Sequence, residues 1–231
     1  MRPFVSLAAA ALLAASPALA QDVSFGGTVA GTNAFPFTNY GFFAANRYQQ
    51  LYVGSQFSGP VFIDAIRFAN SASVAGGGPG SIAPGSYLVR FAVTDRAENG
   101  LGTNFDANIA GYSATFFSGT IGSGLLRIAG ATSYLFDPSR GNLLMDVTVL
   151  SQSPVGFLGL DFSRDAADGT SRVFNSFPLP FSPSVVTSDA LGLNTTFETR
   201  PDIVATPEPA SLALVAGGLG LVVVFARRRR S

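Results

Sequence analysis

Three aspartates, Asp161, Asp165 and Asp168, come closest to a metal-binding pattern in this chain of 231 residues. They fall in a turn region that ends at Gly169, so their carboxylates could gather in one loop and bind a hard cation such as Ca²⁺. Their spacing differs from that of an EF-hand, where ligands recur at every second position. A calcium site is one hypothesis, and solvated turn residues are the other.

Asp146, Asp161 and Glu198 are carboxylates that a glycoside hydrolase could use, because that chemistry needs neither His nor Cys. Two of them would have to face each other about 5 to 9 Å apart across a groove. A carbohydrate-binding module is a related hypothesis, in which exposed aromatic rings stack on sugar rings. The candidate rings are Tyr40, Phe42, Phe43, Tyr48 and Tyr52. Core packing is the alternative for each ring.

The chain contains no Cys, His, Trp or Lys, and all fourteen basic residues are Arg. Without His and Cys it lacks the nucleophilic sites that depend on them and the ordinary ligands of zinc, haem and copper. Without Lys, Schiff-base chemistry and a P-loop are excluded. From Asp22 to Asp202, nine Arg stand against thirteen acidic residues, a net charge of −4, which disfavours phosphate binding. We predict a protein that is not an enzyme, uses no cofactor and binds no nucleic acid.

The elements that must position these side chains are short strands. In residues 85–95, the odd-numbered side chains from Tyr87 to Val93 share one face and the even-numbered ones the other, as in a half-buried strand. Residues 142–150 repeat the pattern, with Asp146 on the side away from the core. Eight strands are predicted, over residues 47–53, 61–69, 85–95, 112–118, 124–128, 142–150, 155–162 and 192–199.

We predict an all-β fold for residues 21–200, an extracytoplasmic domain built as a sandwich of two antiparallel sheets of jelly-roll type. A closed barrel is the alternative. Residues 71–84 are rich in Gly and residues 176–184 contain three Pro, which predicts a long surface loop for each segment.

Residues 1–20 have the three parts of a secretory signal peptide: a basic start, an apolar core, and Ala18 and Ala20 at the positions that a signal peptidase reads. We predict a signal helix here and cleavage before Gln21. An uncleaved anchor is the alternative, although the apolar core is shorter than the roughly 20 residues that span a bilayer.

The linker that follows the domain, residues 201–211, contains the tripeptide Pro207, Glu208 and Pro209. Proline disfavours helix at and before its own position, so this segment is expected to stay extended and accessible to an enzyme.

A membrane anchor is predicted after the linker. Residues 212–226 are apolar and form about 22 Å of helix at 1.5 Å per residue, a short transmembrane span. Residues 227–231 form a basic tail that stays cytoplasmic and fixes the orientation. Its charges are Arg227, Arg228, Arg229 and Arg230.

This order of tripeptide, apolar segment and terminal Arg cluster resembles the PEP-CTERM sorting signal. The resemblance implies handling by an exosortase, a membrane-embedded, transpeptidase-like enzyme of Gram-negative bacteria that make exopolysaccharide. It implies an intermediate anchored in the inner membrane and a final place at the cell surface or in the extracellular matrix. An ordinary single-span anchor is the alternative. Residues 47–50 and 136–146 also resemble stretches of other exported PEP-CTERM proteins, which implies a shared β-sandwich and supplies no catalytic residue.

The sequence therefore predicts an exported surface or matrix protein with a structural or exopolysaccharide-associated role. Its expected partners are signal peptidase, an exosortase-like enzyme, the membrane and exopolysaccharide. A Ca²⁺-dependent carbohydrate-binding module or a glycoside hydrolase is the alternative.

Overall fold

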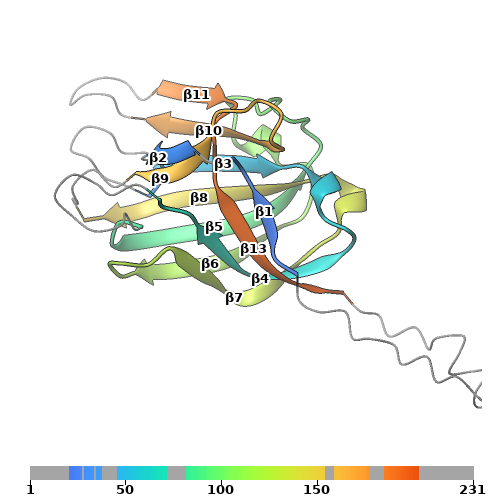
Figure 1. Ribbon diagram of the computed structural model, residues 1–231, viewed down its shortest axis with the longest axis horizontal. Coiled ribbons are helices and arrows are strands. Elements are labelled where there is room, and N and C mark those ends of the chain that lie inside the picture. Colours follow the sequence, from blue (N-terminus) through green and yellow to red (C-terminus); the bar gives the residue numbers. More distant parts are fainter. Residues whose placement is uncertain are drawn as a thin grey trace, which may run out of the picture. The chain divides into compact units, whose positions relative to one another are not determined.

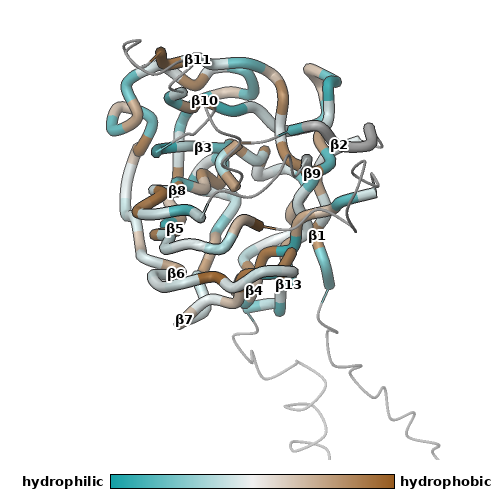
Figure 2. The backbone as a smooth tube through the Cα atoms, turned by 90° about the vertical axis from the view of Figure 1, so that its left-hand side faces the viewer, coloured by the Kyte–Doolittle hydropathy of each residue, from teal (hydrophilic) through white to brown (hydrophobic). Residues whose placement is uncertain are grey.

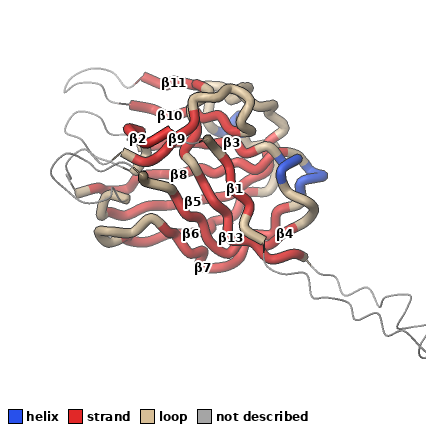
Figure 3. The backbone as a smooth tube through the Cα atoms, viewed as in Figure 1, coloured by secondary structure: helices blue, strands red, loops and turns tan. Residues whose placement is uncertain are grey.

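Alternation of apolar and polar residues produces a chain made of strands, with helix confined to three short 3₁₀ turns in the part that the structure describes (Figure 3). The structure is a computed structural model. It describes residues 21–27, 29–33, 35–37, 46–71, 82–153, 159–176 and 185–202. The strands are β1 (Val23–Phe25), β2 (Val29–Asn33), β3 (Arg47–Tyr52), β4 (Val61–Phe68), β5 (Gly85–Thr94), β6 (Ser113–Ile121), β7 (Arg127–Phe136), β8 (Asn142–Gln152), β9 (Leu160–Ser163), β10 (Thr170–Ser176), β11 (Val185–Asp189), β12 (Gly192–Leu193) and β13 (Thr195–Pro201). The 3₁₀ turns are η1 (Gly54–Gln56), η2 (Asp106–Asn108) and η3 (Pro138–Arg140).

Two large antiparallel sheets contain most of these strands. The six-stranded sheet has the order β11-β10-β3-β8-β5-β6, which runs from top to bottom in Figure 1, and the four-stranded sheet has the order β1-β13-β4-β7. A small third sheet has the order β12-β9-β2. Strands β3 to β8 pair in a nested way: β3 with β8 and β5 with β6 in the large sheet, and β4 with β7 in the other. The predicted all-β class with two antiparallel sheets is confirmed.

Aromatic rings from both sheets fill the space between them. Phe197 of β13 lies with its ring centroid 4.7 Å from that of Tyr52 and 5.9 Å from that of Phe91, both in the six-stranded sheet. Such contacts between rings add to the apolar area that they bury. Figure 2 shows hydrophobic and hydrophilic residues interspersed along the strands.

This core corrects the sugar-stacking hypothesis for two of its rings. Tyr48 and Tyr52 are fully buried, so neither can stack on an external sugar. Tyr40, Phe42 and Phe43 lie outside the described residues.

Residues 95–112, which we call the strap, connect β5 to β6 and cover part of the outer face of the six-stranded sheet. The apolar residues buried beneath and within the strap are Leu51, Ala92, Leu101, Leu144 and Val173. The backbone N–H of Ala110 donates to the carbonyl of Val93 at 3.0 Å. The expectation that β5 is buried on one face only is therefore wrong at its end, where Ala92 and Thr94 are also buried.

Five predicted strands, at 47–53, 61–69, 85–95, 112–118 and 142–150, correspond to β3, β4, β5, β6 and β8. The bounds 124–128 are wrong, because Gly124 has a positive φ of 80° in a turn and β7 starts only at Arg127. The segment 192–199 divides into β12 and β13.

Of the segment 155–162, only the last residues are described, as the start of β9. Strands β1, β2, β10 and β11 were not predicted. Most of the two long loops, the signal helix over residues 1–20 and the segment 212–226 lie outside the described residues. Within residues 21–202, as far as the structure describes them, no helix is long and apolar enough to cross a membrane.

Candidate functional site

The three carboxylates suggested for a hydrolase lie in three different sheets. Asp146 belongs to β8, Asp161 to β9 and Glu198 to β13. Because Met145 and Phe197 point into the core, strand alternation places Asp146 and Glu198 on those faces of the two large sheets that point away from the core. The structure therefore does not place Asp146 and Glu198 as a catalytic pair.

Glu198 is held by arginines. Arg127 donates to both of its carboxylate oxygens at 2.8 and 2.7 Å, and Arg67 lies 3.1 Å away. These hydrogen bonds from Arg127, followed by the charges of Arg127 and Arg67, outweigh desolvation and lower the pKa of Glu198. A general acid needs a raised pKa so that it carries its proton near neutral pH. The lowered pKa of Glu198 is unsuited to that role.

The aspartates suggested for Ca²⁺ bind the protein's own backbone. Asp165 and Asp168 each accept a hydrogen bond from the backbone N–H two residues further on, at 2.9 and 2.8 Å. Asp161 accepts from the backbone N–H of Ser71 at 3.0 Å. The first two are the bonds of Asx turns, which agrees with the turn interpretation. Across the described stretches, no three side chains of ligating type are arranged to hold a metal ion.

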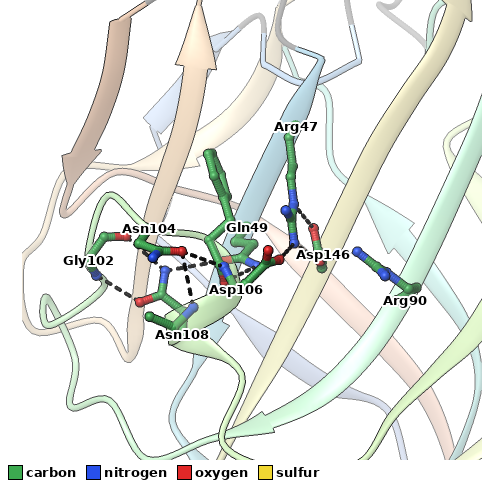
Figure 4. A network of polar contacts seen from close by, with 10 residues as sticks. Arg47, Gln49, Arg90, Gly102, Asn104, Asp106, Asn108 and Asp146 are labelled. Atoms are coloured by element: carbon green, nitrogen blue, oxygen red, sulfur yellow. Dashed lines mark hydrogen bonds and ion pairs between the residues drawn. The ribbon is translucent and has the colours of Figure 1, made fainter.

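An extended polar network surrounds Asp146 (Figure 4). Its side chain is only 1% exposed. Arg47 donates to its two oxygens from Nε at 3.2 Å and from Nη2 at 2.9 Å, and Arg90 donates from Nη2 at 2.8 Å. Charge-assisted bonds of this kind are short and directional. The buried negative charge is thus compensated by two guanidinium groups from the neighbouring strands β3 and β5.

Arg47 connects this buried carboxylate to the strap. Its Nη2 also lies 2.8 Å from Asp106, and its guanidinium carbon is 5.0 Å from the ring centroid of Phe105. Burial acts to lower the pKa of Arg47, but the hydrogen bonds and charges of Asp146 and Asp106 prevail and the pKa is raised. Arg47 therefore stays charged and holds Asp146 of β8 and Asp106 of the strap together.

Two amides continue the network along the strap. Nδ2 of Asn108 donates to Oε1 of Gln49 at 3.0 Å, and Nε2 of Gln49 donates to the carbonyl of Phe105 at 3.0 Å. Asn108 also exchanges hydrogen bonds with the backbone of Gly102, at 2.8 and 2.9 Å. Because Asn108 and Gln49 are fully buried, these bonds satisfy polar groups that would otherwise lose water without replacement.

Gln50, the next glutamine, satisfies buried polar groups in the same way on the inner side of β3. Nε2 of Gln50 donates to the carbonyl of Leu193 at 2.9 Å, and Oε1 of Gln50 accepts from the N–H of Leu193 at 2.9 Å. The amide therefore pairs with β12 as a neighbouring strand would. Tyr48 also donates its hydroxyl to Oε1 of Gln50.

The second segment singled out by resemblance, residues 136–146, lies directly against the first. Strand β8 pairs with β3, with Gln49 opposite Asp146. Asn142 accepts from the N–H of Gly54 at 2.8 Å and donates to the carbonyl of Arg96 at 2.8 Å. Sequence reasoning named both segments without placing them together. The sequence signal for this network was the presence of polar residues, Gln49 and Gln50 in one strand and Asp146 in the other, among apolar residues typical of a core.

The residues of the predicted targeting signals lie outside the described part of the chain, apart from Gln21. They are Ala18, Ala20, Pro207, Glu208, Pro209, Arg227, Arg228, Arg229 and Arg230. Comparison with family models matches residues 205–230 to the PEP-CTERM protein-sorting motif, which confirms the resemblance in the tail. No match was found among curated proteins or among solved structures.

Proposed function

We propose that this chain, which carries a PEP-CTERM sorting motif at residues 205–230, is a non-enzymatic surface or matrix protein that an exosortase-type enzyme sorts. The motif is the observation that carries the proposal. It indicates an exported protein that is recognised by sorting machinery and processed at the membrane. The remaining steps of the proposal, which are signal cleavage, membrane anchoring and release, are inferred from the sequences of residues 1–20 and 201–231.

In this proposal signal peptidase removes residues 1–20 after Ala18 and Ala20 have entered its site. Residues 212–226 then hold the chain in the inner membrane as a single transmembrane helix, while Arg227 to Arg230 remain cytoplasmic. The sorting enzyme acts near Pro207–Pro209 and releases the domain to the surface or matrix of a Gram-negative cell.

The domain supplies a stable scaffold in this scheme. Its nested pairing of β3 to β8 across two sheets supports a jelly-roll-like sandwich. The absence of His, Cys and Lys from the chain and the commitment of Asp146 and Glu198 to arginine partners support a role without catalysis. An association with exopolysaccharide is the role that such a matrix protein would have.

Intact mass spectrometry of the protein from cell envelope and medium, with and without the sorting enzyme, tests the proposal. We expect a mass ending near Pro209 in the parent strain and a mass that includes Arg227 to Arg230 in the deletion strain. A Glu208→Ala variant should behave in the parent strain as the wild type does in the deletion strain. Asp202→Ala, a matched change outside the motif, should be processed normally. A basic tail retained in both strains would overturn the proposal and leave a plain membrane anchor.

A further inference from the structure

We propose that the mature amino terminus closes into a pyroglutamyl ring at Gln21. The inference rests on the proposed function, because signal peptidase must first free the α-amino group of Gln21. That nitrogen then attacks the side-chain carbon Cδ, a new C–N bond forms, and the side-chain nitrogen leaves as ammonia. The product is a five-membered lactam with no charge, and the step needs no oxidant, reductant or co-reactant.

The fold leaves the reacting groups free and holds the rest of the residue. Gln21 is exposed, and the β1 ladder begins only at Val23, which pairs with Phe197. The backbone carbonyl of Gln21 accepts a hydrogen bond from the hydroxyl of Thr199. Ring closure uses the α-nitrogen and the side chain and leaves this carbonyl untouched. The hydrogen bond to Thr199 is therefore compatible with the ring.

The adjacent charge is already balanced without an ammonium group at the terminus. Asp22 forms an ion pair with Arg67. The loss of the terminal positive charge on cyclisation therefore does not leave the Asp22 carboxylate without a partner. A neutral terminus fits this position.

The ring protects a strand on which the core depends. Only Gln21 and Asp22 precede β1 in the mature chain, and β1 contributes Phe25, which is buried. The ring centroid of Phe25 lies 5.0 Å from that of Tyr52 and 5.9 Å from that of Phe197. Because aminopeptidases require a free α-amino group, the lactam stops trimming before it reaches these contacts.

The test uses full protein isolated from the producing cells, analysed by tandem mass spectrometry of its first peptide and by amino-terminal degradation. We expect a wild-type chain that starts at residue 21, lacks one ammonia and resists degradation until pyroglutamyl aminopeptidase removes one residue. The matched variant Gln21→Asn should keep a free amine, because its side chain would require a four-membered ring.

Two outcomes overturn the inference in distinguishable ways. A chain that starts at Gln21 with a free amine and an intact side-chain amide excludes the lactam and leaves export and sorting standing. A chain that still carries residues 1–20 excludes the lactam and also the proposed signal cleavage.

Discussion

At the residue scale, Asp146 holds a negative charge that is almost fully removed from water, with Arg47 and Arg90 as its partners. Removing one member of a buried ion pair leaves the others uncompensated and costs about 3 to 5 kcal/mol in fully buried cases. Arg47 and Arg90 are 23% and 30% exposed and can regain some water. We therefore expect Asp146→Asn to lower the free energy of unfolding by about 2 kcal/mol, measured by urea denaturation.

The control for this prediction is Asp106→Asn. Asp106 is bound to the same Arg47 but is 81% exposed, and exposed ion pairs contribute little. Its loss should change the free energy of unfolding by no more than about 0.5 kcal/mol. Equal losses in the two variants would contradict the view that burial makes Asp146 the centre of the network.

The buried tyrosines lead to a second prediction at the residue scale, that the fold loses stability at alkaline pH. Burial raises the pKa of Tyr87 and of Tyr134 to about 12, and raises the pKa values of Tyr48 and Tyr52 as well. A tyrosine in the unfolded chain loses its proton near pH 10. The stability from these groups is therefore complete below pH 10 and is lost as pH rises from 10 through 12.

The measurement is an absorbance titration of tyrosinate, followed together with circular dichroism. We expect these four side chains to ionise only as the fold is lost, so that their part of the absorbance change coincides with the change in circular dichroism. Tyr112, which is 69% exposed, does not belong to this group. In denaturant the tyrosines should titrate near pH 10. Full ionisation with the native circular dichroism spectrum intact would rule out the buried positions described for them.

At the element scale, the turn from η3 into β8 depends on Gly141. Its φ is 135°, and a Cβ atom added there would lie 2.6 Å from the carbonyl oxygen of Thr94. We expect Gly141→Ala to lower the free energy of unfolding by about 2 to 3 kcal/mol, from backbone strain and the clash together.

Gly122→Ala is the matched change for this turn. A Cβ added to Gly122 meets nothing within 4 Å, so its effect should stay within about 0.5 kcal/mol. Thermal or urea unfolding of both variants gives the comparison. If Gly141→Ala left the free energy of unfolding unchanged, β8 would be able to begin without this backbone conformation.

The strands that sequence predicted best are those whose local pattern matches their surroundings. In β5 the side chains of Tyr87, Val89 and Phe91 alternate with less buried ones, and all three lie in the core. Strand β10 was not predicted because its sequence reads as polar. Its Arg172 is nevertheless buried, bound to Asp189 at 2.7 Å and to Asn33 at 2.8 Å. Asn33 is 139 residues away in the sequence and Asp189 lies on the neighbouring strand β11, so the local pattern of β10 reveals neither partner.

The same reasoning applies to the polar network. The alternation of side chains along residues 142–150 correctly placed Asp146 on the face away from the core. It also led us to expect that this face is exposed to solvent. The aspartate side chain is bound by Arg47 and Arg90 of the neighbouring strands, and Arg47 also binds Asp106 of the strap. A contact between Asn108 and Gln49, far apart in the sequence, fixes the strap to β3. The tail was recognisable without structure, because its order of tripeptide, apolar segment and Arg cluster is a local property of the chain.

At the scale of the whole molecule, the sorting tail and the folded unit are separable along the chain. The thirteen strands of the described residues all lie within the unit Leu19–Asp202, and the last of them ends at Pro201. If the core belongs to this unit alone, removal of the tail leaves every strand pairing intact. The proposed processing near Pro209 would then release a domain that is already stable.

We therefore expect a chain of residues 21–202 to unfold cooperatively, with the same denaturation midpoint as the protein that keeps its tail. A chain of residues 21–194 is the control, because it lacks β13. That strand lies between β1 and β4 and carries Phe197 of the core, so its loss should abolish cooperative unfolding. Circular dichroism during urea denaturation follows all three chains. A markedly lower midpoint for residues 21–202 would show that the tail stabilises the domain and that sorting and folding are coupled.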